Sequence, residues 1–302
     1  MKAHTEFSGR YELVKRKVYD LDGSVQSLKF SNIITDIGLE RWATGSIGSR
    51  CQIGSGNSTP AVTDTGLQST LATTTQKVTT ANWLTYSVAE RWTEVTICYR
   101  FTPGITLNSI AEVGIGWDGG LWSRSLIKDA GGNPTTIQLL SDEVLDVYYT
   151  LRMQFPATDA TGSITLDGVT YDWVMRPANI QSVPAVADAW FSSAYGKGTM
   201  PATCTASPDA MTAVNSRPVA LTTCDTITPA AYTAGSKTQR ITYVFALGTA
   251  NFGIKTVSPA IGEQYVNMMW QLGFYQGGAP VAVPKTNSKR LTLTFDFSWG
   301  RA

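Results

Sequence analysis

The chain has 302 residues, enough for one large β domain or two ordinary ones, and either would bury a substantial core. Its net charge of +1 excludes a strong field that would steer it towards nucleic acid or an anionic membrane. Charged residues make up only 16% of the chain, against roughly 25% in an ordinary soluble domain. Such a surface suits a subunit packed among copies of itself, although a threonine-rich β protein would also show it.

The first predicted elements are a β-hairpin and a short helix. Arg10 to Asn32 contains two apolar segments around Asp22-Gly23, a pair that favours the positive φ angles of a tight turn. A helix is expected next, because Thr35 can cap it and Gly45 can end it. The residues predicted on its buried side are Leu39 and Trp42.

The middle of the chain carries the strongest strand patterns. Apolar and polar residues alternate from Val95 to Phe101 and again from Leu145 to Phe155, as they do when one face of a strand is buried. Two further hairpins are predicted where turn residues separate apolar segments. Their turns are Asp118-Gly-Gly120, between Ile110 and Ile127, and Asp167-Gly168, within Gly162 to Trp173.

The pattern changes after Pro177. Residues Pro201 to Ser236 are rich in Ala, Thr, Ser and Pro and contain few large apolar groups, so they are predicted to form a long excursion over the surface. Strands resume at Ile241 to Phe245 and at Tyr265 to Leu272. The last strand, Leu291 to Trp299, alternates strictly, so its apolar side chains are predicted to share one buried face.

Together these elements predict a mainly β protein. The expected fold is an antiparallel β-sandwich of jelly-roll type with one short N-terminal helix and long loops. Residues 1–302 would form a single sandwich domain or two closely packed lobes, about 1–177 and 178–302, with 201–236 as the surface excursion. Because the last strand needs partners and the best candidates lie in the middle of the chain, both parts are expected to share one core.

No signal for secretion or membrane insertion is evident. Met1 to Arg10 lacks the apolar run of a signal peptide, and no stretch reaches the roughly 18 apolar residues of a membrane helix. We therefore expect synthesis in the cytosol. Asn57-Ser-Thr59 matches a glycosylation sequon, which has no meaning without secretion.

Cysteine and histidine usage argues against a metal site. Cys51, Cys98, Cys204 and Cys224 form no CxxC pair, and the only histidine, His4, stands apart in a terminus that is expected to be flexible. No metal and no cofactor is predicted. Cys98 is expected to pack within a strand. Cys204 and Cys224 bracket a loop and would bridge if oxidised, but free thiols are expected in a reducing compartment.

No catalytic residue is predicted, and the chain is not expected to be an enzyme. A Ser or Cys nucleophile needs a base, which His4 in a terminus does not supply. Gly54-Ser-Gly56 resembles a phosphate loop, yet no Lys-Ser/Thr follows it. Asp142 and Glu143 are neighbours in a strand and point to opposite faces, so they are interpreted as the charged start of a strand rather than an acid/base pair.

Aromatic residues near predicted turns are the one candidate binding feature. Rings with a polar edge suit sugar stacking, subunit contacts or core packing, and packing in a core or an interface is favoured here. No sugar site is assigned from them. The residues concerned are Trp117, Trp122, Trp190, Phe191, Tyr195 and Tyr232.

Several segments of the first half carry motifs. Ser31 to Trp42 contains an Asn-x-Ile-Thr-x-x-Gly element, Cys51 to Pro60 a Gly-x-Gly turn, and Thr63 to Leu67 a Thr/Asp-rich stretch that ends in Leu. Glu112 to Gly116 and Leu121 to Asp129 contain a Glu-x-Gly-Ile strand and a returning strand with an Arg. These motifs resemble those of a diffuse set of tailed-bacteriophage virion proteins. The resemblance covers roughly the first half well and the C-terminal strand loosely.

The resemblance implies a structural subunit of a bacteriophage virion, in a tail, collar, baseplate or fibre-attachment position. Such a subunit would self-assemble into a symmetric homo-oligomer and contact other virion proteins, because covering strand edges and apolar faces stabilises every copy. It would be located in the virion after synthesis in the host cytoplasm. No binding of nucleic acid and no membrane insertion is expected.

Two alternative functions remain. One is a receptor- or glycan-binding module of a phage tail appendage, with aromatic loops such as Trp190 to Tyr195 contacting a host surface glycan. The other is a glycan depolymerase that acts through two carboxylates, which is the least favoured because no such pair stands out in the sequence.

Overall fold

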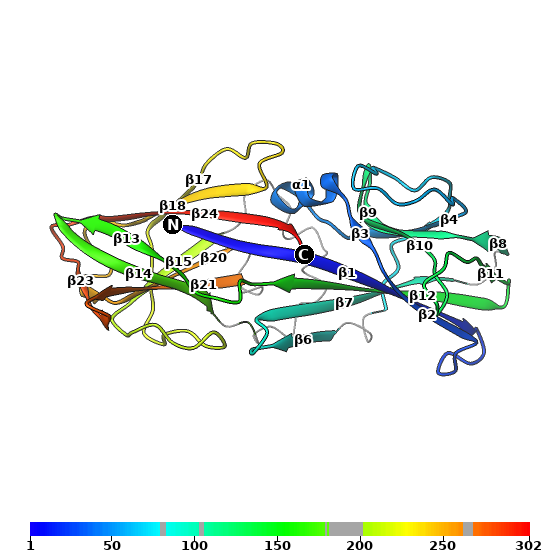
Figure 1. Ribbon diagram of the computed structural model, residues 1–302, viewed down its shortest axis with the longest axis horizontal. Coiled ribbons are helices and arrows are strands. Elements are labelled where there is room, and N and C mark those ends of the chain that lie inside the picture. Colours follow the sequence, from blue (N-terminus) through cyan, green and yellow to red (C-terminus); the bar gives the residue numbers. More distant parts are fainter. Residues whose placement is uncertain (79–82, 103–105, 179, 181–201, 262–267) are drawn as a thin grey trace.

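The computed structural model describes residues 1–302 except 79–82, 103–105, 179, 181–201 and 262–267. Strands account for 57% of the chain and helix for 3%, which confirms the prediction of a mainly β protein with one short helix near its N-terminus. The molecule is elongated, and its sheets are layered along the long axis (Figure 1). This arrangement is sandwich-like, as predicted.

An eight-stranded sheet, here called the long sheet, extends along most of the molecule (Figure 1). Its order is β17-β18-β24-β1-β12-β7-β6, with β2 paired to β1. The strands are β1 Lys2–Lys17, β2 Gln26–Ser31, β6 Trp83–Ser87, β7 Trp92–Phe101, β12 Glu143–Gln154, β17 Thr226–Pro229, β18 Thr238–Phe245 and β24 Leu291–Arg301.

β1 joins the two halves of the long sheet. Its first residues pair in parallel with β24, with Lys2 opposite Asp296, and its later residues pair antiparallel with β12 and β2. The other pairs described in this sheet are antiparallel. The first and last strands of the sequence therefore lie side by side in the middle of the sheet (Figure 1).

A five-stranded sheet covers one half of the long sheet, and α1 packs beside its β10. Tyr11 Oη of β1 lies 2.6 Å from Ser123 Oγ, and the Trp122 indole donates to Tyr149 Oη at 2.8 Å, so the core lies between the two layers. The sheet order is β3-β10-β9-β4-β5. The elements are β3 Ile33–Ile34, α1 Asp36–Thr44, β4 Arg50–Gly54, β5 Thr70–Thr74, β9 Glu112–Trp117 and β10 Gly120–Leu126.

A seven-stranded sheet covers the other half. Phe155, which follows β12, packs edge-on against Trp270 of this sheet with ring centres 5.7 Å apart. The sheet order is β13-β14-β21-β20-β15-β16, with β22 paired to β21. The strands are β13 Ala160–Leu166, β14 Val169–Ala178, β15 Ala202–Ser207, β16 Thr222–Thr223, β20 Thr256–Ile261, β21 Met268–Gln276 and β22 Ala279–Pro280.

Buried apolar side chains of both halves form one contiguous cluster that includes Phe7, Tyr149 and Phe295. The division of the chain into one domain or two lobes stays a prediction.

Two small two-stranded ribbons complete the described strands. They are β8 Leu107–Ile110 with β11 Ile137–Leu139, and β19 Gly253–Ile254 with β23 Val283–Pro284.

The helix forms where the sequence predicted it. Thr35 Oγ1 accepts a hydrogen bond from Gly38 N at 2.9 Å, which satisfies one of the free N–H groups of the first turn. Leu39 and Trp42 are buried, as predicted. Gly45 follows the last turn in an extended conformation, so the helix ends there without a left-handed residue.

The three predicted hairpins are present, and two of them turn as predicted. Gly119 has φ +100° between β9 and β10, and Asp167 and Gly168 have φ +52° and +78° between β13 and β14. The hairpin of β1 and β2 differs. Its connection is a longer loop from residue 18 to residue 25, in which the Asp20 side chain accepts from Gly23 N.

The terminal strand confirms its alternating pattern, because the apolar side chains of β24 are buried and the intervening residues are more exposed. β12 is buried on both faces over most of its length, since it lies between β1 and β7 in the centre of the sheet. The predicted strand Tyr265 to Leu272 corresponds to β21 from Met268 onwards. Residues 265–267 lie outside the described residues.

The interpretation of 201–236 as a surface excursion is wrong for part of the segment. β15, β16 and β17 lie within it and pair with strands of the two larger sheets. Cys204 and Ala206 are fully buried. Small side chains give little hydrophobic signal in a sequence. They can still occupy core positions when neighbouring strands form hydrogen bonds with their backbone and shield them from solvent.

Candidate functional site

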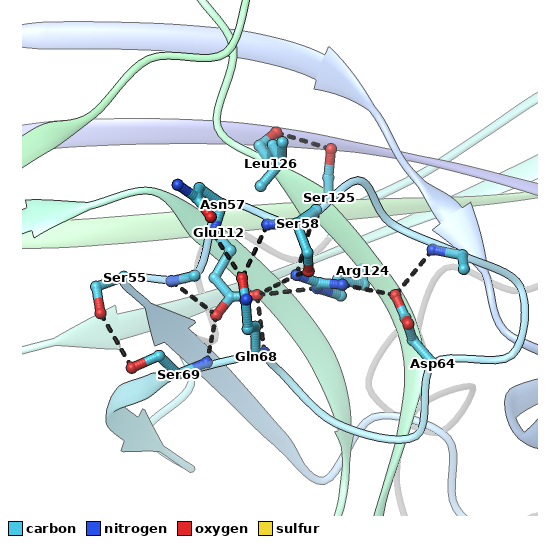
Figure 2. A network of polar contacts seen from close by, with 12 residues as sticks. Ser55, Asn57, Ser58, Asp64, Gln68, Ser69, Glu112, Arg124, Ser125 and Leu126 are labelled. Atoms are coloured by element: carbon cyan, nitrogen blue, oxygen red, sulfur yellow. Dashed lines mark hydrogen bonds and ion pairs between the residues drawn. The ribbon is translucent and has the colours of Figure 1, made fainter.

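Glu112, the first residue of β9, places a fully buried carboxylate beside the loop of residues 55–69 that connects β4 and β5. Three backbone N–H groups of this 55–69 loop donate to it. Gly56 N and Ser69 N reach Oε1 at 3.0 and 2.8 Å, and Gln68 N reaches Oε2 at 3.1 Å (Figure 2). These bonds offset the cost of taking a carboxylate out of water.

Arg124 of β10 completes the network from the opposite strand of the hairpin. Its buried guanidinium donates from Nε to Glu112 Oε2 at 2.9 Å. The other nitrogens reach the 55–69 loop: Nη1 donates to Asp64 Oδ2 at 2.7 Å, and Nη2 donates to Ser58 O at 3.2 Å and to Ser58 Oγ at 3.0 Å. One side chain thus holds the carboxylate and two points of the loop (Figure 2).

Gly54 and Gly56 lie where the Glu112 carboxylate approaches the backbone closely. A Cβ at Gly54 would lie 2.6 Å from Glu112 Oε1, and a Cβ at Gly56 would press against the same oxygen and lie 2.5 Å from Gln68 Cβ. Gln68 Oε1 also accepts two backbone N–H groups of the turn, each at 2.8 Å. The Gly54-Ser-Gly56 turn, set aside as a phosphate loop, surrounds a carboxylate of the protein itself.

The network unites the motifs found in the first half of the sequence. The Gly-x-Gly turn, the Thr/Asp-rich stretch, and the Glu and Arg of the β9–β10 hairpin meet within one set of hydrogen bonds (Figure 2). Glu112 and Arg124 are shielded from solvent and occupied by these partners. The arrangement can therefore fasten the 55–69 loop to the hairpin, whereas a substrate would have no access to the two charges.

A second charged cluster lies on the face of the long sheet that points away from the five-stranded sheet. Glu94 of β7 accepts from Arg10 Nη1 and Nη2 at 2.6 and 2.8 Å and from Arg152 Nε at 2.7 Å. Burial raises the pKa of Glu94, but the two guanidinium groups outweigh burial and hold the pKa below its usual value. The cluster links β1, β12 and β7.

Asp146 forms a similar cluster nearer the start of β12. Its buried carboxylate accepts from Arg100 Nε and Nη2 at 2.7 and 2.8 Å and from Arg16 Nε at 3.2 Å. No role is predicted for these residues from the sequence. The sequence does contain a signal for such clusters. Acidic residues on the polar face of one strand have arginines on the polar face of the neighbouring strands, and opposite charges on one face of a sheet can pair.

Asp142 and Glu143 lie next to lysines of β1. Lys17 Nζ is 2.9 Å from Asp142 Oδ2 and 3.2 Å from Glu143 Oε1, and Lys15 Nζ is 3.4 Å from Glu143 Oε2. The hydrogen bond from Lys17 lowers the pKa of Asp142. These contacts tie the start of β12 to the end of β1, and Glu143 is buried while Asp142 is half-exposed.

The four cysteines are buried thiols. Burial raises the pKa of each one, to about 12 for Cys98, so the reactive thiolate form is suppressed. Cys204 and Cys224 are neighbours in space, because Cys224 N donates to Cys204 O at 2.8 Å. Within the described residues, no group of three or more His, Cys, Asp or Glu side chains could hold a metal ion.

The expectation of a flexible terminus around His4 is wrong. His4 lies in β1 opposite Ser298 of β24, and its Nδ1 is 2.8 Å from Ser298 Oγ. Parallel pairing with the last strand orders the beginning of the chain, and no local pattern reveals so distant a partner.

Across the ranges that the structure describes, no helix is long and apolar enough to span a membrane.

The aromatic candidates that can be placed are packed against other parts of the protein. Trp117 and Trp122 are buried. Tyr232 stacks on Trp299 with ring centres 5.9 Å apart, and its hydroxyl donates to Glu40 Oε2 at 2.7 Å. The loop aromatics that lie outside the described residues are Trp190, Phe191 and Tyr195.

Comparison of the chain with protein-family models, curated proteins and solved structures finds no match. Functional inference therefore rests on the geometry of the protein itself. The charged clusters around Glu112, Glu94 and Asp146 join strands and loops, and their partners are parts of the same chain.

Proposed function

We propose that the protein is a structural subunit of a bacteriophage virion, in a tail, collar, baseplate or fibre-attachment position, which self-assembles into a symmetric homo-oligomer. The proposal begins from the motifs that resemble phage virion proteins. In this chain those motifs build the Glu112–Arg124 network, whose role is to hold a loop on a sheet. The proposal assigns no catalytic reaction and places the protein in the virion with other virion proteins as partners.

The observation that carries the proposal is the apolar β1–β2 loop, residues 18–25. Four of its large apolar side chains face solvent, with exposed fractions of 44% for Val18, 78% for Tyr19, 43% for Leu21 and 54% for Val25. Large apolar groups gathered on one exposed loop are typical of an interaction surface, because covering them removes apolar area from water.

The base of the β1–β2 loop is held in place. Val18 N donates to Asp142 O at 3.0 Å, and Val25 N donates to Lys15 O at 2.8 Å. The Arg16 side chain also donates from Nη1 to Gly23 O at 2.9 Å. A loop that is already ordered loses little conformational entropy when a partner binds, so its apolar tip suits a stable contact with another copy.

The oligomeric state of the purified protein tests the proposal. Size-exclusion chromatography with light scattering should give a defined oligomer for the wild type. The double variant Tyr19→Ser, Leu21→Ser should shift this oligomer towards the monomer, because it removes apolar area from the contact. Circular dichroism should show that the variant keeps its β fold.

Val219→Ser provides the matched control. Val219 is 91% exposed and lies in a different loop, so its replacement should leave the oligomer unchanged. A wild type that stays monomeric at high concentration would contradict self-assembly. An oligomer that survives the double variant at the same concentration would show that the β1–β2 loop is not the contact.

A receptor- or glycan-binding module of a tail appendage is the alternative function. The aromatic loop expected to carry it, Trp190 to Tyr195, lies outside the described residues. A different feature favours this alternative, namely a groove over β13, β14 and β21 on the outward face of the seven-stranded sheet, where aromatic and polar side chains lie together.

A further inference from the structure

The seven-stranded sheet turns one face to the core, and its outward face is hollowed. The hollow lies over β13, β14 and β21 and has a volume of about 750 Å³, within the range of small-molecule sites. We refer to it as the β13–β14–β21 groove. Its lining includes two carboxylates, a guanidinium, two hydroxyls and two aromatic side chains, from Asp159, Asp172, Arg176, Thr161, Ser163, Trp173 and Tyr275.

The strand register explains the shape of the groove. Ser163, Asp172 and Tyr275 lie in one row across the three strands. In the next row, β21 contributes Gly273 opposite Val174. Because glycine has no side chain, β21 is low at this point, and Tyr275 and Met211 fill the space, so Gly273 is buried beneath them. The larger side chains of the adjacent row line the groove.

Tyr275 leans along β21 over this low point. A Cβ at Gly273 would lie 3.0 Å from Tyr275 Cε2 and 3.4 Å from Tyr275 Oη, and Met211 Cβ would lie 3.2 Å away on the other side. The tyrosine is half-buried. Its ring therefore rests close to the strand, where it can offer an apolar face to the C–H groups of a ligand in the groove.

The charges around the groove balance one another. Arg176 Nη2 lies 2.5 Å from Asp159 Oδ2, and Arg91 Nη1 donates to Asp159 Oδ1 at 2.8 Å. Asp172 is exposed in the middle of the row, directly opposite Tyr275. Two carboxylates and two guanidinium groups give no net charge, which favours a neutral ligand over a strongly anionic or cationic one.

We propose that the β13–β14–β21 groove binds a neutral saccharide. The Tyr275 ring packs on the C–H face of one sugar unit, and the Asp172 carboxylate accepts hydrogen bonds from its hydroxyl groups. Ser163 and Thr161 exchange hydrogen bonds with further hydroxyls. An apolar ligand fits less well, because it would desolvate the carboxylate and the hydroxyls without replacing their hydrogen bonds. This inference does not depend on the oligomer proposed above.

Binding of the full chain to defined neutral oligosaccharides tests the proposal. The probes are immobilised oligomers of glucose, galactose, mannose and N-acetylglucosamine, with a sialylated oligosaccharide for comparison. A probe that binds is then titrated in solution by calorimetry. We expect the wild type to bind at least one neutral probe and Tyr275→Ala to weaken that binding about tenfold, as the loss of an aromatic contact should.

Two further variants make the result specific. Asp172→Asn changes an exposed side chain, so the fold should persist while the affinity for the same probe falls. Tyr86→Ala is the control, because Tyr86 is an exposed tyrosine of β6 in another sheet and its loss should not alter binding.

Three outcomes would overturn the proposal. They are a wild type that binds none of the neutral probes at about 1 mM, binding confined to the sialylated probe, and neutral-probe binding that Tyr275→Ala and Asp172→Asn leave unchanged. None of them bears on the β1–β2 loop, whose test is the oligomeric state, so the two proposals can fail separately.

Discussion

Glu112, Glu94 and Asp146 are carboxylates that the fold removes from water, and each has an arginine partner. Leaving such a charge without its partner would cost about 3 to 5 kcal/mol, although a well-packed apolar pair could be equally stable. The pairs hold the strands and loops that carry them in fixed positions. The fixed fork of a guanidinium can hold several acceptors at once, as Arg124 holds a glutamate, an aspartate and a serine.

Gly56→Ala is expected to destabilise the protein by about 1 to 3 kcal/mol. The added Cβ would press on the Glu112 carboxylate, which is held by several hydrogen bonds, and on Gln68 Cβ. One of these groups would have to move within a packed loop. The free energy of unfolding, measured by urea titration with tryptophan fluorescence, checks the expectation.

Gly66→Ala is the matched control for this substitution. Gly66 lies in the same loop, but nothing is within 4 Å of the position that its Cβ would take. Its replacement should change the free energy of unfolding by less than about 0.5 kcal/mol. A similar loss at both glycines would contradict the view that the carboxylate determines where glycine is needed.

Among the elements, β24 depends on its neighbours on both sides. It pairs antiparallel with β18 and parallel with β1, and its apolar side chains meet other aromatic rings in the core. Phe295 packs edge-on against Tyr243 and stacks beside Phe297. The outward residue Thr294 is half-buried and lies 3.0 Å from the hydroxyl of Thr242.

Phe295→Ala is expected to lower the free energy of unfolding by about 3 to 5 kcal/mol. The fully buried ring leaves a cavity that the surrounding rings cannot fill. Thr294→Ala should cost far less, about 1 kcal/mol, because it removes one hydroxyl contact at a half-buried position. Urea unfolding of the two variants gives the comparison, and small, equal effects would contradict the assignment of the two faces.

For the whole molecule, ion pairs connect parts that are far apart in the sequence. Asp36, at the start of α1, lies 2.7 Å from Arg301 Nη2 near the end of the last strand and 3.0 Å from Lys237 Nζ. Asp296 pairs with Arg240 at 2.6 Å. Together with the cluster around Glu94, these pairs link strands β18, β24, β1, β12 and β7 of the long sheet and connect the sheet to the helix.

Stability is expected to fall as the pH is lowered below about 4.5. Hydrogen bonds from arginine side chains hold the pKa of Asp36 and the pKa of Asp296 below their ordinary value of 3.8. Burial raises the pKa of Glu94, but two arginines outweigh it, so this pKa lies below its ordinary 4.5. The unfolded chain then binds protons at a higher pH than the folded chain, and the stabilisation present above these ordinary values is lost as the pH falls through the folded pKa values.

Urea midpoints measured from about pH 6 to about pH 3 at constant ionic strength check this expectation. Asp36→Asn should make the decline with pH less steep, because one of the contributing carboxylates is gone. Asp118→Asn is the control, since this carboxylate is 92% exposed and its ion pair with Arg50, at 3.1 Å, is a surface contact that should contribute little to stability. A midpoint that does not move with pH would show that the pairs contribute no stability.

Several local features of this protein could be predicted from its amino-acid sequence. Alternation in β24, the cap of α1 at Thr35 and the turn at Asp167-Gly168 were all predicted from neighbouring residues, because pleating, capping and positive φ depend on local geometry. The class of fold follows from the same local signals.

The contacts between distant segments could not be predicted from the sequence. The parallel pairing of β1 with β24, the burial of Cys204 in a segment of small residues, and the meeting of Gly56, Glu112 and Arg124 each join residues that are far apart along the chain. A local pattern carries no information on such partners, because their contacts form only when segments far apart in the sequence pair or pack together.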